Sequence, residues 1–186
     1  MMSLQKNPIK VIFLDRDGTI IKDTGFPYKK TDLSFKSYSI EGLRRMAELG
    51  YNLIIVTNQS GIGRGLFTEA EYYNFNNYIL DALRENDIEI DHVFQCFHSP
   101  EENCNCRKPR TGMVSEYLSE NIIDFNHSFT IGDKKTDVEF GKNINTNTIL
   151  INSELVSPYS IESEQHYIAK HLLSASNLIE NLYAAK

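Results

Sequence analysis

The stretch from Val11 to Ile21, VIFLDRDGTII, constrains the fold of this chain more than any other. Its four apolar residues Val11 to Leu14 are typical of a strand that is buried on both faces. The run ends in Asp15-Arg16-Asp17-Gly18-Thr19, where the glycine lets the chain turn sharply. Open α/β sheets bind ligands at the carboxyl ends of their strands. Two carboxylates at such an end therefore indicate a site, although a strand that ends in solvated acids has the same pattern.

Predicted strands and helices alternate along the rest of the chain. Short apolar runs predict strands, and apolar positions at helical spacing predict helices. The expected strands span about 52–57, 92–97, 128–131 and 148–151, with an extended piece near 167–168. The expected helices span about 40–47, 72–83, 111–120, 136–143 and 176–183. This alternation indicates an α/β fold, in which a Rossmann-like parallel sheet carries helices on both faces.

Two segments interrupt the alternation. Residues 22–37 are mostly polar, and we expect them to form a flap over the end of the first strand. Residues 154–165 have the weakest pattern, and we expect them to be the loosest part of the chain. A length of 186 residues is enough for a real core and suits a single domain over residues 1–186.

The net charge of the chain narrows the classes of partner that it could bind. A formal net charge of −6 argues against a nucleic-acid coat or a membrane-surface role, but it leaves room for a locally basic site. No apolar run approaches the length of a membrane span. The N-terminal residues MMSLQKNPIK lack the apolar stretch of a signal peptide. We therefore expect a cytoplasmic protein without a nucleic-acid or membrane partner, and a monomer by default.

Polar residues end three of the predicted strands. These are Asp15 and Asp17, then Thr57 and Asn58, and then Asp133, with Asp137 one turn later. The ends of parallel strands meet along one edge of a sheet, so Asp15 and Asp133 are expected to face each other. Two carboxylates that close together are costly without a cation between them. Because the ligands are oxygens, the predicted cation is Mg²⁺.

Basic residues follow the same predicted edge. Arg107, Lys108 and Arg110 form one cluster, Lys134 and Lys135 follow Asp133, and Arg64 lies in a glycine-rich loop. Cations beside a carboxylate–metal site in an acidic protein favour a phosphate ligand. For Lys134 or Lys135 taken alone, a solvated basic face fits equally well.

The three cysteines lie together with a histidine, in the pattern Cys96-x-His98-x5-Cys104-x-Cys106. Three thiolates and one imidazole suit a tetrahedral Zn²⁺ site. The alternative is three reduced cysteines beside an unrelated histidine. With four protein ligands no coordination position stays open, so the zinc of this loop, residues 96–106, would be structural.

These motifs together resemble those of the haloacid-dehalogenase-like phosphatases. DRDGT, a strand that ends in Thr57-Asn58, Lys108 before a proline, and Gly132-Asp133-x-x-x-Asp137 occur in the family's order over residues 10–151. Within that superfamily the chain is similar to the heptose-bisphosphate and histidinol-phosphate phosphatases. They share DRDGT, TNQ, and a Cys/His loop that runs directly into Arg-Lys-Pro.

The resemblance implies a role for each motif residue. Asp15 would be the nucleophile that forms an aspartyl-phosphate, and Asp17 would be the general acid and base. Mg²⁺ would bind Asp15, the carbonyl of Asp17 and Asp133, and Asp137 would orient Lys108 or metal-bound waters. Thr57 and Lys108 would bind the phosphoryl oxygens. The substrate contacts it implies are Asp23, Thr24, Gly25, Phe26, Thr57, Asn58, Gln59, Ser60, Arg64, Arg107, Lys108 and Lys134.

The resemblance also raises the expectation of zinc in the Cys/His loop. Arg107 and Lys108 directly follow Cys106. We hypothesise that zinc holds this loop so that both cations point at the phosphate.

The loops of the chain bear on which phosphorylated substrate it takes. No insertion large enough for a separate cap domain is present, so the cap is minimal and loops must recognise the leaving group. The loop TNQSGIGRG with Gly65-x-Phe67-Thr68 resembles the heptose-bisphosphate phosphatases, whereas the short x5 spacing in the zinc loop resembles the histidinol-phosphate branch. The length of a loop around a structural metal varies easily, so the resemblance of the TNQSGIGRG loop carries more weight than the spacing in the zinc loop.

The predicted reaction is therefore removal of the 7-phosphate of D-glycero-D-manno-heptose 1,7-bisphosphate. The first alternative is a histidinol-phosphate phosphatase. Less expected are a polynucleotide 3′-phosphatase, which the acidic chain disfavours, and a non-catalytic binding protein of the same fold.

Overall fold

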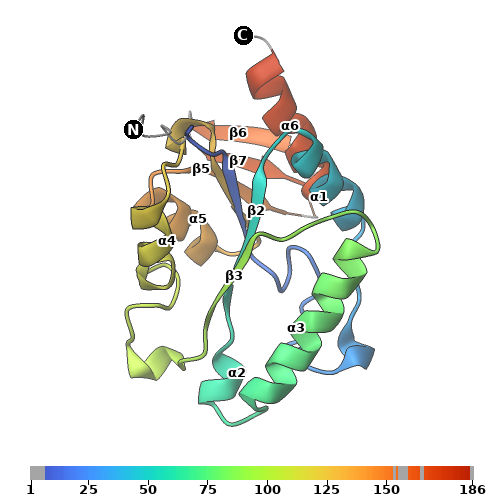
Figure 1. Ribbon diagram of the computed structural model, residues 1–186, viewed down its shortest axis with the longest axis vertical. Helices are drawn as coiled ribbons and strands as arrows, with labels where there is room; N and C mark the ends of the chain where they lie inside the picture. Colours follow the sequence, from blue (N-terminus) through green and yellow to red (C-terminus); the bar gives the residue numbers. More distant parts are fainter. Residues whose placement is uncertain (1–6, 153, 155–158, 164–165, 185–186) are drawn as a thin grey trace, which may run out of the picture.

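The computed structural model describes residues 7–152, 154, 159–163 and 166–184 of the 186. Figure 1 shows the arrangement of its helices and strands. The strands are β1 (Val11–Leu14), β2 (Asn52–Asn58), β3 (His92–Cys96), β4 (Phe129–Gly132), β5 (Asn147–Ile151), β6 (Tyr159–Ser163) and β7 (His166–Ala169). The α-helices are α1 (Ser39–Glu48), α2 (Ser60–Gly63), α3 (Glu69–Arg84), α4 (Ser115–Glu120), α5 (Lys135–Asn143) and α6 (Leu172–Ala184). Short 3₁₀ turns are η1 (Lys30–Asp32), η2 (Pro100–Glu102), η3 (Gly112–Val114) and η4 (Phe125–His127).

The strands form one sheet in the order β3-β2-β1-β4-β5-β7-β6. Neighbouring strands from β3 to β7 pair in parallel, and only the edge strand β6 pairs antiparallel, with β7. β1 lies in the middle, between β2 and β4. The residues that follow β1, β2 and β4 are therefore brought together at one edge of the sheet.

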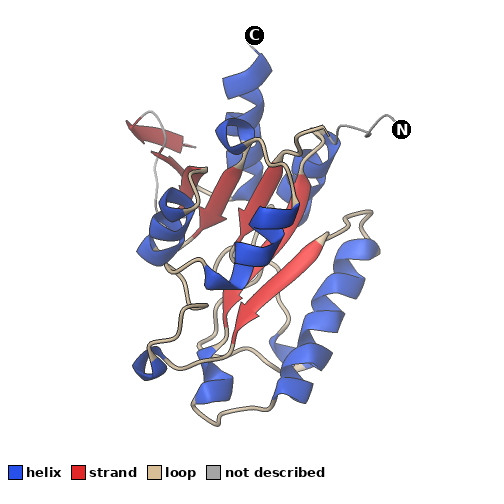
Figure 2. Ribbon diagram, turned by 60° about the vertical axis from the view of Figure 1, so that its left-hand side comes forward, coloured by secondary structure: helices blue, strands red, loops and turns tan. Residues whose placement is uncertain are grey.

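Both faces of the sheet are covered by helices, as Figure 2 shows. Alternate residues of β1 belong to different cores, because side chains along a strand point to opposite faces. Ile12 and Leu14 join a cluster with residues of α1, α3 and α6. Val11 and Phe13 join a second cluster with residues of α4 and α5. This central strand is buried on both faces, as its apolar run predicts.

The structure confirms the predicted α/β fold and corrects it in the last third. Each predicted strand and helix is present to within a few residues, but α6 begins at Leu172, about one turn before the expected start. Within the segment 154–165, which the sequence analysis expects to be the loosest part of the chain, Tyr159–Ser163 form the strand β6, which is not among the predicted strands. Residues 155–158 and 164–165 lie outside the described residues. In the flap, the isolated pairing of Ile21 with Phe35 brings the two ends of the segment together beside β1.

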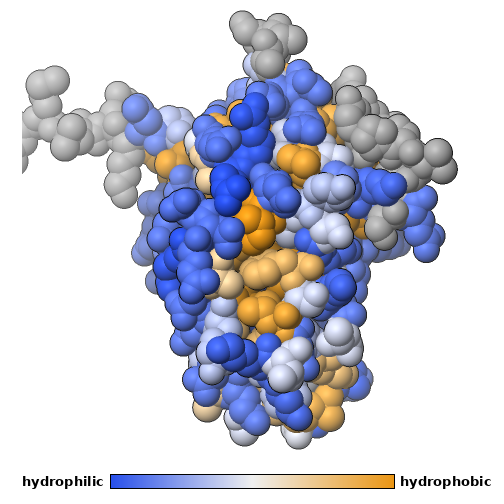
Figure 3. All heavy atoms as spheres, turned by 90° about the vertical axis from the view of Figure 1, so that its right-hand side faces the viewer, coloured by the Kyte–Doolittle hydropathy of each residue, from blue (hydrophilic) through white to orange (hydrophobic). Residues whose placement is uncertain are grey.

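The surface carries apolar as well as polar side chains. Figure 3 shows a strip of apolar groups, bordered by polar ones, on the side of the molecule where α1 and α3 cover the sheet. Partly buried residues such as Leu33, Phe35 and Leu80 pack against the first cluster. Over the described part of the chain, no helix combines the length and the apolar character needed to cross a membrane.

Candidate active site

A cavity of about 320 Å³ lies where β1 and β2 end, beside the start of α5. The residues after β1 contribute Asp15 and Asp17 to its wall, and those at the end of β2 contribute Thr57 and Asn58. Lys108 enters the wall from the segment that follows the Cys/His loop. The convergence of strand ends that the sequence predicts is therefore present.

Two glycines permit the close approach of the acidic residues. Gly18 has a φ of +95°, and a Cβ there would lie 2.1 Å from Oδ2 of Asp133. A Cβ on Gly132 would lie 2.3 Å from the Cβ of Asp137. Any larger residue at either position would push the carboxylates away from the turn after β1.

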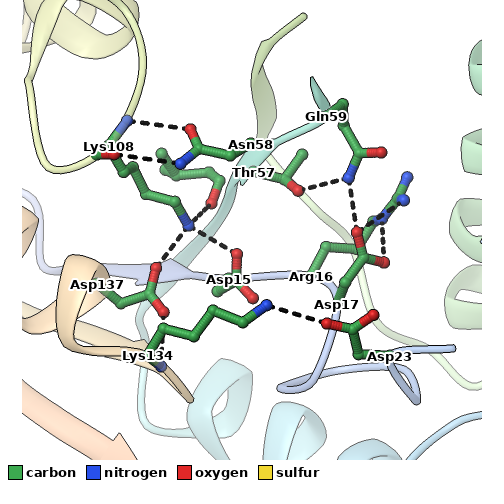
Figure 4. A network of polar contacts seen from close by, with 11 residues as sticks. Asp15, Arg16, Asp17, Asp23, Thr57, Asn58, Gln59, Lys108, Lys134 and Asp137 are labelled. Carbon is green, nitrogen blue, oxygen red and sulfur yellow. Dashed lines mark hydrogen bonds and ion pairs between the residues drawn. The ribbon is translucent and has the colours of Figure 1, made fainter. Parts of the chain in front are cut away.

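Lys108 is buried between two carboxylates, as Figure 4 shows. Its Nζ lies 2.6 Å from Oδ1 of Asp15 and 2.7 Å from Oδ1 of Asp137, and it donates to the carbonyl of Val56 at 2.5 Å. Burial alone would lower the pKa of Lys108, but the two carboxylates outweigh burial and raise it. Burial raises the pKa of Asp15 to about 7, although Lys108 opposes the shift. Lys108 thus places a positive charge beside the predicted nucleophile.

Asp15, Asp133 and Asp137 could together hold a metal ion. One oxygen from each lies within 4.8 Å of the others. Oδ2 of Asp15 and Oδ1 of Asp133 are buried and have no hydrogen-bond partner among the described residues. Burial raises the pKa of Asp133, although the positive charges of Lys134 and Lys36 oppose the shift. Unpaired buried carboxylate oxygens fit a hard divalent cation, so these residues suit Mg²⁺.

Asn58 fastens the Lys108 segment to the sheet. Its Oδ1 accepts from the backbone N–H of Lys108 at 3.0 Å, and its Nδ2 donates to the backbone carbonyl of Lys108 at 3.2 Å. Both polar groups of this side chain therefore bond the backbone of Lys108. The side chain that the resemblance assigns to substrate contact thus orients a cation in this structure.

Asp17 lies on the other side of the cavity from Lys108 (Figure 4). Both oxygens of its carboxylate accept from the guanidinium of Arg16, at 2.9 and 3.0 Å. Gln59 Nε2 donates to Oδ2 of Asp17 at 2.6 Å and to Oγ1 of Thr57 at 2.8 Å. The polar groups after β1 and β2 are therefore joined in one network.

The flap reaches the cavity through Asp23, Gly25 and Phe26. Lys134 Nζ donates to Oδ2 of Asp23 at 3.0 Å, which ties the flap to the residue before α5. Burial would raise the pKa of Asp23, but the bond from Lys134 lowers it overall. The ring of Tyr28 stacks on Phe67 at 5.0 Å, so this flap aromatic packs against the protein rather than lining the cavity.

Most of the residues predicted for catalysis, substrate contact and Mg²⁺ line this cavity, and three do not. Thr24 is exposed and does not line the wall, and Asp133 belongs to the acidic group described above without lining the wall. Arg64 also lies outside, because α2 carries it away from the strand end, and it faces Glu101 at 3.7 Å. Those that line the wall are Asp15, Asp17, Asp23, Gly25, Phe26, Thr57, Asn58, Gln59, Ser60, Arg107, Lys108 and Lys134.

Sequence reasoning missed Pro27 and Thr136, which line the cavity, and two further residues near it. Arg16 binds Asp17 from outside the cavity, and Lys36 Nζ donates to the carbonyl of Gly18 at 2.5 Å. The sequence did hold a signal for Arg16. It directly follows Asp15 at the end of a strand, and successive side chains along a strand point to opposite faces of the sheet. Lys36 lies at the far end of the flap, and nothing in its neighbourhood in the sequence marks it.

The Cys/His loop forms a compact cluster away from the cavity. Sγ of Cys106 lies 3.1 Å from Sγ of Cys96, 3.3 Å from Sγ of Cys104 and 3.1 Å from Nδ1 of His98. Four ligands about 2.3 Å from a tetrahedral zinc would be separated by roughly 3.5–3.8 Å. The four side chains therefore fit one zinc ion, and Cys96 anchors them to the end of β3.

Comparisons with known proteins give the same grouping. A model of the family described as polynucleotide kinase 3 phosphatase matches residues 10–150. A D-glycero-beta-D-manno-heptose-1,7-bisphosphate 7-phosphatase of Helicobacter pylori is 39% identical over 157 residues, which cover 83% of this chain and 91% of that protein. The histidine biosynthesis bifunctional protein HisB of Legionella pneumophila is 38% identical over 144 residues, which cover 76% of this chain and 41% of that protein.

A solved structure shares the fold. It is the crystal structure of D,D-heptose 1,7-bisphosphate phosphatase from B. bronchiseptica complexed with magnesium and phosphate, with a TM-score of 0.81 and 23% identity. The match covers 94% of this chain and 99% of that chain. The acidic residues at the strand ends and the buried Lys108 therefore occur in a chain whose sequence relatives and fold indicate the same family. It belongs to the haloacid-dehalogenase-like phosphatases, in the family of the D-glycero-D-manno-heptose-1,7-bisphosphate 7-phosphatases.

Proposed function

We propose that this protein hydrolyses the 7-phosphate of D-glycero-D-manno-heptose 1,7-bisphosphate and leaves the 1-phosphate in place. The observation that carries the proposal is the pairing of Asp15 with Lys108 at 2.6 Å in the wall of an open cavity, with Asp17 opposite. This arrangement supplies a nucleophile, a charge for the phosphoryl group and a separate acid–base residue. The family membership supports the choice of a phosphate monoester as substrate.

The first half of the reaction forms an aspartyl-phosphate. The free oxygen of Asp15 attacks phosphorus, and the bond from phosphorus to the sugar oxygen breaks. Asp17 donates its proton to that oxygen as it leaves, so the sugar departs as a neutral alcohol. Lys108 and the hydroxyl of Thr57 face the phosphoryl group and stabilise its oxygens.

The second half releases inorganic phosphate. Asp17, now a carboxylate, accepts a proton from a water molecule that attacks phosphorus. The bond between phosphorus and the Asp15 oxygen breaks, and the free Asp15 carboxylate returns. Each proton that Asp17 gives in the first half is thus recovered in the second.

Two metal ions belong to the proposal. Asp15, Asp133 and the backbone carbonyl of Asp17 would hold Mg²⁺, which when bound neutralises charge on the phosphoryl oxygens. Cys96, His98, Cys104 and Cys106 would hold a structural Zn²⁺. Asp137 is a less suitable magnesium ligand, because its oxygens already accept from Lys108 and from the backbone N–H of Lys134.

Arg107 supports a substrate with a second phosphate. It lines the cavity, and its Nη1 is buried without a partner among the described residues. A guanidinium suits the planar recognition of phosphate oxygens. The likeness to HisB and the short zinc loop favour a second candidate, histidinol phosphate, which has one phosphate and an imidazole.

A panel of substrates tests the proposal. Phosphate release would be measured with Mg²⁺ for the heptose 1,7-bisphosphate, histidinol phosphate, a 3′-phosphorylated oligonucleotide and an aryl phosphate. We expect the largest kcat/KM for the heptose bisphosphate, and no turnover of any of them by Asp15→Asn. A larger value for histidinol phosphate or the oligonucleotide would overturn the substrate assignment. Lack of turnover of every substrate would overturn the enzyme assignment.

The cellular setting completes the proposal. We place the reaction in the cytoplasm, where sugar phosphates are made and cysteines stay reduced. The chain is proposed to act as a monomer on a small phosphorylated substrate, without a nucleic-acid or membrane partner.

A further inference from the structure

Arg16 is a fully buried arginine that the proposed chemistry does not use. Its exposed fraction is 0%, and it does not line the cavity. Its guanidinium carbon lies 5.3 Å from the ring centroid of Tyr72 and 5.3 Å from that of Phe75, both on α3. Burying a charged side chain is costly, and the cost is offset only when the partner geometry is good. The partner therefore indicates what Arg16 does.

That partner is Asp17. Nε and Nη2 of Arg16 donate in parallel to its two carboxylate oxygens, at 2.9 and 3.0 Å, as the dashed lines of Figure 4 show. Nη1 has no partner among the described residues. A two-pronged pair of this kind fixes the plane as well as the position of a carboxylate. Arg16 thus directs its hydrogen bonds at the residue that has to move protons.

We propose that Arg16 is a positioning residue, which holds the Asp17 carboxylate at the place and angle needed for proton transfer to the leaving oxygen and from water. The inference rests on the proposed function. The rings of α3 hold the guanidinium, and the guanidinium holds the carboxylate. Without this fork, rotation about the side-chain bonds of Asp17 would point its oxygens away from the substrate. Small displacements of a catalytic group reduce rates by about a hundredfold.

Gln59 does not replace the fork. It donates one hydrogen bond to Oδ2 of Asp17, which leaves the plane of the carboxylate free to turn. A lysine at position 16 would keep the charge but would offer a single point of contact rather than a planar pair. Arg16→Lys and Arg16→Met therefore separate the effect of charge from the effect of geometry.

The test is a double-mutant cycle between positions 16 and 17, with kcat and KM measured for the heptose bisphosphate. We expect kcat to fall about a hundredfold in Arg16→Met and about tenfold in Arg16→Lys, with KM within about twofold of wild type. In an Asp17→Asn background, both Arg16 substitutions should change kcat by less than about threefold, because the positioned group is absent. Arg45→Met, which removes a half-buried arginine of α1 that pairs with Glu48 and Glu180, is the control and should leave kcat unchanged.

A second readout separates positioning from damage to the fold. A p-nitrophenolate leaving group departs without a proton, so formation of the aspartyl-phosphate from p-nitrophenyl phosphate does not need Asp17 as an acid. In Arg16→Met and Arg16→Lys, the burst of p-nitrophenol should keep its wild-type rate within about twofold. A site distorted by loss of the buried arginine would slow both substrates alike.

The outcomes are distinct. Equal losses from an Arg16 substitution with and without Asp17, a rise in KM instead of a fall in kcat, or a slowed burst would each overturn the positioning role. If Arg16→Met does not fold, the Arg16→Lys cycle decides alone by the same criteria. If Asp17→Asn keeps wild-type kcat, the acid–base role in the proposed function fails first.

Discussion

At the scale of single residues, the site depends on how charges are paired below the cavity. Lys108 is enclosed by the carboxylates of Asp15 and Asp137 and by the carbonyl of Val56. Three negative or partly negative groups around one buried ammonium group hold the ends of β1 and β2 and the start of α5 together. The lysine that faces the phosphate is therefore also a structural tie.

This double role gives the first prediction, which concerns Lys108→Met. The substitution leaves two carboxylates buried without their cation, and breaking a buried pair costs about 3 kcal/mol or more. We expect the free energy of unfolding, measured with urea in the presence of a chelator at pH 8, where Asp15 is ionised, to fall by about 3 kcal/mol. Lys135→Met is the control, because its side chain is 88% exposed, and it should change stability by less than about 0.5 kcal/mol. A loss below about 1 kcal/mol in Lys108→Met would contradict the prediction.

The second prediction uses the pH dependence of stability without metal. Burial raises the pKa of Asp15 from 3.8 to about 7. Between these values the folded protein holds a proton at Asp15 that the unfolded chain has released. The stability contributed by this group is therefore complete below about pH 4 and is lost as pH rises to 7.

The measurement compares wild type with Asp15→Asn. In a chelator, the free energy of unfolding of wild type should decrease from pH 5 to pH 8 more than that of the variant, which has no proton to lose there. Adding Mg²⁺ at pH 8 should recover stability in wild type only, because the ion binds the carboxylate of the folded state. Parallel pH curves for the two proteins would show that Asp15 does not titrate in this range.

At the scale of elements, two attachments hold the segment with Arg107 and Lys108. The Cys/His cluster ties it to the end of β3, and the side chain of Asn58 ties it to the end of β2. From the sequence alone, zinc is the predicted attachment, and the bonds from Asn58 are not foreseen. Because the segment is attached twice, losing one attachment should shift Arg107 and Lys108 without detaching the segment from the sheet.

The third prediction follows for Cys104→Ala. Removing one of four ligands should lower zinc content from about one ion to near zero per chain, because a structural site binds weakly with three ligands. We expect kcat to fall about tenfold, since Asn58 still holds the backbone of Lys108, and the thermal midpoint to fall as well. Glu101→Ala changes an exposed residue of the same loop and is the control. Unchanged zinc, or zinc loss with normal kinetics and stability, would contradict the proposed role of the loop.

The same scale shows what the sequence could and could not predict. The strands around β1 were predictable because apolar runs and terminal acids coincide, which also placed Asp15 and Asp133 on one edge. β6 was missed although its residues YSIES alternate, because a short edge strand depends on its partner β7 for stability. Arg64 lies outside the cavity because the short helix α2 directs its side chain away from the end of β2. No residue pattern predicts a helix of four residues. The direction of a loop side chain is decided by tertiary contacts.

At the scale of the whole molecule, the region that matches the family model is smaller than the folded unit. The match ends at residue 150, yet the core on the α1 side continues into β7 and α6. Ala169, Leu172 and Ala175 are buried there, and a Cβ on Gly42 of α1 would lie 2.4 Å from the backbone of Leu172. The C-terminal elements are therefore a built-in part of the layer that supports β1.

The last prediction concerns a chain that ends after Asn152. It keeps every residue proposed for catalysis and for zinc, but it exposes the apolar face of α1 that α6 covers. Each buried leucine or isoleucine lost from such a core costs roughly 2–3 kcal/mol, and the stability of a whole domain is about 5–15 kcal/mol. We expect the shortened protein to lose its cooperative urea transition and its activity, whereas a chain that ends after Ala184 keeps both. If the shortened chain unfolded cooperatively with wild-type kcat, the active site would be independent of its C-terminal support, and the single folded unit proposed for residues 1–186 would have to be divided.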